Sequence, residues 1–147
     1  MKKIRLEREY YSQPGQPCHV TICSRGGNTI FTNREFTLGC MALLESLCNK
    51  YDFKLYAYCF MPEHLHFTIA VESEKSIIGL VQAFKSLATK ESYRFGLKGK
   101  IFQTRFYDHF PRTWEDFEKH VRYILENPVR KGLVQSPEDY PFSKCFY

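Results

Sequence analysis

Alternation of apolar and polar positions is the clearest pattern in this chain. A strand turns successive side chains to opposite faces, so a strand with one buried face alternates in this way. Stretches with this alternation, rich in β-branched and aromatic residues, predict four strands at residues 18–23, about 52–60, 64–71 and 101–110.

Between these stretches apolar residues recur every three or four positions, which is typical of helices with one buried face. The pattern predicts a helix at about 33–49, opened by the capping box Thr32-Asn33-Arg34-Glu35, and a second at about 74–93. A third helix is expected to start after the cap at Thr113 and to stop at Asn127-Pro128, because proline usually ends a helix.

The order strand-helix-strand-strand-helix-strand, followed by one more helix, predicts an α+β fold of the ferredoxin-like type. We expect a four-stranded antiparallel sheet (βαββαβ) with two helices on one face, and an additional C-terminal helix. A single domain should span residues 1–147, with a polar lead-in at 1–16 and a loop-like tail at 129–147.

The composition of the chain excludes few classes of function. The chain has 147 residues, a net charge of +5 and six cysteines, none of them in a Cys-x-x-Cys pair. The basic charge is compatible with a polyanionic partner. No segment has the composition of a signal peptide or a membrane span, so we expect a reduced, cytoplasmic protein without membrane attachment.

His64-Leu65-His66 is the first candidate for chemistry. On a strand the two imidazoles point to one side and Leu65 to the other, which makes half of a metal site. His19, on the first predicted strand, is a candidate third ligand or a structural histidine. The pair itself could equally be surface histidines or part of a hydrogen-bond network.

Tyr123 and Asn127 lie four residues apart on the third predicted helix, hence on one helical face. The amide oxygen of Asn127 can join two imidazoles around Mg²⁺, Mn²⁺ or Zn²⁺, with the phenol of Tyr123 one turn away. The alternative is that Tyr123 is a half-buried aromatic residue and that Asn127 only ends the helix.

Together these motifs resemble a known family. The segment Met61-Pro62-Glu63-His64-Leu65-His66 is similar to the histidine–hydrophobe–histidine (HUH) motif of single-tyrosine transposases, and the segment from Tyr123 to Val134 is similar to their C-terminal signature. Phe102-Gln103-Thr104-Arg105-Phe106, Tyr140-Pro141-Phe142-Ser143 and Cys18-His19-Val20-Thr21 resemble elements of the REP-associated tyrosine transposases. The resemblance spans roughly residues 17–143.

This resemblance implies cleavage and rejoining of single-stranded DNA near a hairpin, through a 5′-phosphotyrosine and a free 3′-OH. It implies that Tyr123 is the nucleophile and that His64, His66 and Asn127 bind a divalent metal, with Mg²⁺ or Mn²⁺ favoured. Family members often have asparagine before the first histidine, where this chain has Glu63.

Basic residues are the candidates for contact with the DNA backbone, and solvated surface is the alternative for about half of them. They are Lys85, Lys90, Arg94, Lys98, Lys100, Arg105, Arg122, Arg130 and Lys131. Base stacking and core packing are the two roles considered for four aromatic residues, Phe102, Phe106, Tyr107 and Trp114.

Two other functions compete with a transposase. One is a non-catalytic ferredoxin-like domain that binds nucleic acid, with structural histidines. The other is a small zinc hydrolase, for which His109, His120 and Glu63 are the candidate residues. A homodimer formed through an exposed sheet edge and a monomer are both compatible with the sequence.

Overall fold

The computed structural model describes residues 15–72 and 76–146. In this part of the chain five strands form one antiparallel sheet in the order β4-β1-β3-β2-β5. The strands are β1 (Pro17–Cys23), β2 (Phe53–Met61), β3 (His64–Val71), β4 (Tyr107–His109) and β5 (Ser143–Cys145). The α-helices are α1 (Arg34–Lys50), α2 (Ile77–Ser92) and α3 (Trp114–Arg130).

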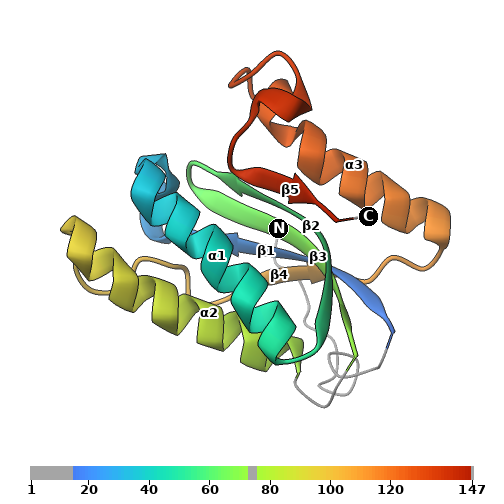
Figure 1. Ribbon diagram of the computed structural model, residues 1–147, viewed down its shortest axis with the longest axis horizontal. Coiled ribbons are helices and arrows are strands. Elements are labelled where there is room, and N and C mark those ends of the chain that lie inside the picture. Colours follow the sequence, from blue (N-terminus) through green and yellow to red (C-terminus); the bar gives the residue numbers. More distant parts are fainter. Residues whose placement is uncertain (1–14, 73–75, 147) are drawn as a thin grey trace.

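The elements form three layers. Figure 1 shows α1 and α2 side by side over one face of the sheet, while α3 lies across the other face. The order β1-α1-β2-β3-α2-β4 confirms the ferredoxin-like arrangement. The face that this arrangement leaves open is the one that α3 covers.

The tail was expected to be loop-like, and this prediction was wrong at Ser143–Cys145. These residues form β5, which pairs with β2 and extends the sheet from four strands to five. The amide of Phe60 donates to the carbonyl of Phe142, and the amide of Phe146 donates to that of Tyr56. The outer edge of β2 thus satisfies its backbone groups with a three-residue segment that is too short to show alternation.

The fourth strand is shorter than the predicted 101–110. Only Tyr107–His109 pairs as a strand with β1, and Phe102 makes an isolated bridge to Ser24. The carbonyls of Gln103, Thr104 and Arg105 accept hydrogen bonds from Nζ of Lys85 instead. Phe102 and Phe106 are buried in the core, whereas Tyr107 and Trp114 are exposed.

Two of the expected helix ends were also wrong. α1 begins one residue later than expected, with the side chain of Asn33 as its cap instead of Thr32. α3 continues through Pro128 to Arg130. Gly132, with φ +73, donates to the carbonyl of Val129, and Leu133 donates to that of Pro128, so the helix ends in the glycine-type turn and not at the proline.

α2 begins at Ile77, where the side chain of Ser76 accepts a hydrogen bond from the amide of Gly79. The earlier start expected at residue 74 lies outside the described residues. Short 3₁₀ turns complete the described secondary structure at Arg25–Gly27, Ile30–Thr32, Tyr93–Phe95 and Pro137–Asp139.

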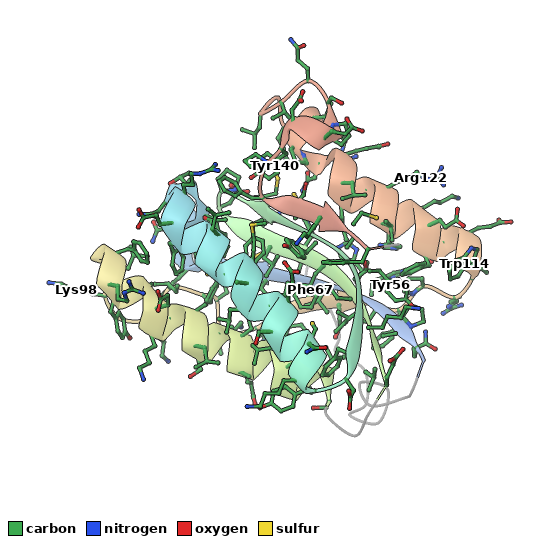
Figure 2. The ribbon with its side chains drawn as sticks, viewed as in Figure 1. Tyr56, Phe67, Lys98, Trp114, Arg122 and Tyr140 are labelled. Atoms are coloured by element: carbon green, nitrogen blue, oxygen red, sulfur yellow. The ribbon has the colours of Figure 1, made fainter. Side chains whose placement is uncertain are left out.

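Strand alternation divides the apolar side chains between two cores. The larger core lies between the sheet and α1 and α2, and it includes the fully buried Phe67 of β3, which is labelled in Figure 2. On the other face Phe117, Val121 and Ile124 of α3 pack over β2. Burial of each such side chain stabilises the fold by about 1.5–3 kcal/mol, so α3 is firmly docked. It therefore holds its polar residues in a defined position over β3.

All six cysteines lie within the described residues, and none of them is in a disulfide bond. Within the described residues, none of the helices is long and apolar enough to cross a membrane.

Candidate active site

His64 and His66 lie on the face of β3 that α3 covers. Leu65 between them is fully buried in the larger core, as the alternation predicted. His66 lies in register with Thr21 of β1 and Cys59 of β2. The ring centroids of the two histidines are 4.5 Å apart. The sheet therefore presents the two imidazoles side by side under α3.

Each of these imidazoles has one ring nitrogen engaged by a neighbouring side chain. Nδ1 of His64 lies 2.7 Å from Oε1 of Glu63. Nδ1 of His66 lies 3.0 Å from the hydroxyl of Thr21 and 3.1 Å from Nε2 of His19. Partners of this kind orient an imidazole and direct its other nitrogen, Nε2, to a metal ion.

His66 is 8% exposed. Its burial lowers its pKa to about 3, and the nearby His64 and Arg130 act in the same direction. At neutral pH His66 is therefore a neutral imidazole, which is the form that binds a metal.

Asn127 comes from the last turns of α3 and is 2% exposed. Its Nδ2 lies 3.4 Å from Nε2 of His64. A half-turn of the amide places the oxygen there instead, because the two ends of an amide have nearly the same shape. Two imidazoles and one amide oxygen, on side chains that lie beside one another, form a donor set that is chemically suited to a divalent ion.

Tyr123 lies one turn before Asn127 and is 48% exposed. The centroid of its ring is 5.9 Å from that of His66 and 6.4 Å from that of His19. On the other side, the guanidinium of Arg130 lies 4.1 Å from the ring centroid. The phenol is thus held beside the histidine pair and stays accessible to a large substrate.

A cavity of about 270 Å³ lies next to Tyr123. Its lining residues are His19, Lys119, His120 and Tyr123, three of which come from α3. The cavity therefore lies between His19 of the sheet and the cationic side chain of Lys119 on α3.

The comparisons identify the family of this chain. Residues 13–126 match the family model described as "Transposase IS200 like", which is more than half of the chain and includes both histidines and Tyr123. The chain belongs to the IS200-like transposases.

Two curated relatives agree with the family. A protein of Haemophilus influenzae named as a REP-associated tyrosine transposase is 30% identical over 107 residues, covering 65% of this chain and 61% of its own. The REP-associated tyrosine transposase of Escherichia coli K12 is 32% identical over 91 residues, covering 62% of this chain and 53% of its own. This IS200-like chain therefore spans only about half to three fifths of the relatives' length.

Solved structures support the fold. A REP-associated tyrosine transposase bound to a REP hairpin has a TM-score of 0.76 and 25% identity, and the match covers 97% of this chain and 82% of that one. A structure from Deinococcus radiodurans described as a transposase has a TM-score of 0.57 at 16% identity, with coverages of 86% and 97%. The second match bears on the fold alone.

The basic residues expected to contact DNA do not form one cluster in this IS200-like chain. Figure 2 shows Lys98 beyond the end of α2 and Arg122 on α3, at opposite ends of the molecule. Lys85 contacts the carbonyls of residues 103–105, and Arg94 pairs with Glu91. Most of the others are exposed, among them Lys90, Lys100, Arg105 and Lys131.

His19 was considered as a third ligand or a structural histidine, and in the structure its Nε2 contacts His66. Thr21, which contacts His66, and Lys119, which lines the cavity, were not singled out from the sequence. The residues considered for a zinc hydrolase separate into two groups: Glu63 lies beside His64, whereas His109 and His120 lie with Asp116. The sequence does indicate that His19 and Thr21 share one face of β1, because they lie two residues apart on a strand. Their pairing with β3 depends on strand register, which the local sequence does not encode.

Proposed function

We propose that this chain cleaves and rejoins single-stranded DNA, with Tyr123 as the nucleophile. The observation that carries the proposal is the position of the Tyr123 ring, 5.9 Å from His66, with Asn127 one turn further on in contact with His64. The docked helix α3 thus carries a phenol and an amide close to a pair of imidazoles, which supports the proposed roles of Tyr123 and Asn127. The family and the named relatives support the same chemistry.

In the proposed step the phenolic oxygen of Tyr123 attacks a phosphorus of the DNA. The new O–P bond forms as the bond from phosphorus to the 3′-oxygen breaks, and the tyrosine proton is released while the leaving oxygen gains one. The products are a 5′-phosphotyrosine and a free 3′-OH. Attack by a 3′-OH reverses the step, so the energy of the phosphodiester is kept in the covalent link.

His64, His66 and Asn127 would hold the divalent metal, for which we propose Mg²⁺ or Mn²⁺. When bound, the ion would supply positive charge near a phosphate oxygen. The chain's own residues do the rest of the positioning. Arg130 restrains the phenol from one side, and the 270 Å³ cavity beside Tyr123 can receive the nucleotide next to the scissile bond.

We propose hairpin DNA as the substrate, because the structural relative at 25% identity is bound to a REP hairpin. Exposed basic residues would contact the DNA backbone, and their scattered positions suit a substrate larger than the site itself. Of the candidates, Arg122, Arg130 and Lys131 lie closest in sequence to the nucleophile.

The test is formation of a covalent adduct. Purified protein is mixed with a labelled single-stranded library that contains hairpins, with Mg²⁺ or Mn²⁺ or with chelator, and the products are separated on a denaturing gel. We expect a metal-dependent protein–DNA band that Tyr123→Phe abolishes. Tyr93→Phe is the matched control, because Tyr93 is similarly exposed but follows α2, away from the site.

An adduct that persists in Tyr123→Phe would overturn the assignment of the nucleophile. Hairpin binding without any adduct would favour the non-catalytic binding domain instead. Sequencing the captured strand would identify the cleavage site.

A further inference from the structure

A second group of side chains that could bind a metal lies beside the candidate active site and shares none of its proposed metal ligands. His109 comes from the last residue of β4, and Asp116 and His120 come from the first half of α3, one turn apart on one helical face. His109 lies in register with His19 of β1, so its side chain is on the face that α3 covers. The docking of α3 on the sheet thus brings three potential ligands together.

The distances fit a single ion. Oδ2 of Asp116 lies 3.5 Å from Nε2 of His109, and Oδ1 lies 3.8 Å from Nε2 of His120. One ligand atom from each residue can be chosen so that all three lie within 4.8 Å of one another. Ligands on one zinc ion are each about 2.0–2.2 Å from it, so two of them lie up to about 4.4 Å apart. The rings of His109 and His120 are stacked, with centroids 4.6 Å apart, so the half-exposed His109 ring must turn out of the stack to complete the set.

The other nitrogen of His120 has a partner inside the protein. Nδ1 of His120 lies 2.7 Å from Nδ1 of His19, whose Nε2 contacts His66. A ligating histidine commonly uses its second nitrogen in this way, which fixes the ring and its tautomer. The group is also open on one side, since the His109 side chain is 50% exposed, so an ion can reach it.

We propose that His109, Asp116 and His120 bind a second metal ion, of the Zn²⁺ type. Two imidazoles and one carboxylate suit Zn²⁺, Co²⁺ or Ni²⁺ better than Mg²⁺, which prefers oxygen ligands. The site shares no residue with His64, His66 and Asn127. It does not depend on DNA cleavage, so its failure and the failure of the proposed function are separate results.

The ion would connect an edge strand to the helix that carries Tyr123. β4 is held in the sheet by only three residue pairs, with β1. A link from His109 to two turns of α3 would restrain both elements. Its expected effect is therefore on stability and on the position of α3.

The test uses the His64→Ala/His66→Ala double variant, which removes the first metal site and leaves the second. Chelator-treated protein is titrated with Zn²⁺ by calorimetry, and with Co²⁺ by absorption spectroscopy. We expect one remaining site per chain and a rise in melting temperature on Zn²⁺ addition. Adding Asp116→Asn to the double variant should weaken Zn²⁺ binding by at least about 100-fold. This is more than the loss of affinity of about 10- to 100-fold that is typical when a residue that only hydrogen-bonds to a metal ligand is replaced.

Glu115→Gln is the matched control, because Glu115 is an exposed acid next to Asp116 that is outside the group. Cys145→Ser is included throughout, since Cys145 is the exposed thiol. The Co²⁺ spectrum should lack the charge-transfer absorption of thiolate ligands.

His109→Gln in the otherwise unchanged chain keeps the test decisive if the double variant does not fold. This change at a half-exposed position should lower the Zn²⁺ stoichiometry from two to one. The proposal is overturned if the double variant binds no Zn²⁺, or if binding is unchanged by Asp116→Asn. The three side chains would then be an ion-pair network of a carboxylate and two histidines.

Discussion

The guanidinium of Arg130 lies 4.1 Å from the centroid of the Tyr123 ring, and its Nη2 donates to the carbonyl oxygen of Tyr123 at 2.5 Å. Arg130 therefore stacks on the proposed nucleophile and is anchored to the backbone of the same residue. The histidines lie near the ring as well, so the phenol is restrained by both the helix and the sheet.

Replacing Arg130 should slow cleavage without preventing folding. A cation over an aromatic ring is worth about 0.5–2 kcal/mol, so we expect Arg130→Ala to lower the rate of adduct formation about tenfold at saturating DNA. Arg130→Lys should recover part of the rate, because lysine keeps the charge but not the planar stack. Arg122→Ala is the control and should alter DNA affinity only. Equal rates for Arg130→Ala and the unchanged chain would show that the stack does not position Tyr123.

Thr21 should matter for metal affinity although it is not a ligand. Its hydroxyl is 3.0 Å from Nδ1 of His66 and helps to orient the ring. Loss of such a partner typically costs about 10- to 100-fold in affinity. Because His19 remains as a second partner, we expect Thr21→Val to weaken Mn²⁺ binding about tenfold, measured by calorimetry. Thr29→Val, an exposed threonine in a loop, should leave binding unchanged. An unaltered affinity in Thr21→Val would assign the orientation of His66 to His19 alone.

The metal-free protein should lose stability in acid because of His66. In the folded chain burial lowers the pKa of this imidazole to about 3, and His64 and Arg130 add to the effect. In the unfolded chain the imidazole takes up a proton near its ordinary pKa of about 6.5. The unfolded state therefore binds more protons between these values, and stability falls with decreasing pH by up to about 1.4 kcal/mol per unit.

Urea unfolding at pH 7, 6, 5 and 4 would measure this dependence. His66→Gln has no titrating group at this position, so its stability should change less with pH over the same range. Thr21 contacts the same imidazole, and Thr21→Val separates the influence of its hydroxyl from that of burial. Parallel pH profiles for His66→Gln and the unchanged chain would contradict the prediction.

Lys85 should contribute to stability whatever its role in DNA binding. Its ammonium donates to the carbonyls of Gln103 and Thr104 at 2.7 and 3.2 Å and holds the irregular segment before β4. Hydrogen bonds to charged groups are worth about 1.5–3 kcal/mol, and solvent weakens this exposed set. We expect Lys85→Met to lower the free energy of unfolding by about 1 kcal/mol, and the exposed control Lys90→Met to change it by less than about 0.5 kcal/mol. Similar unfolding curves for the two variants would show that the segment does not need Lys85.

The sequence by itself determined the elements that have a strong local pattern. Alternation at 64–71 predicted β3 and the common face of His64 and His66, and the four-residue spacing predicted the common face of Tyr123 and Asn127. These patterns are visible because burial of one face sets the period of a strand or a helix. The order of the elements was enough for the ferredoxin-like arrangement.

Only the tertiary structure decided what has no local period. β5 exists because the open edge of β2 accepts three residues of the tail, and α3 runs past Pro128 to a turn at Gly132. The contacts of His19 with His66 and His120, and of His109 with Asp116, join four separate elements. Such contacts depend on strand register and on the docking of α3, which arise from the packing of distant residues and leave no periodic trace in the chain.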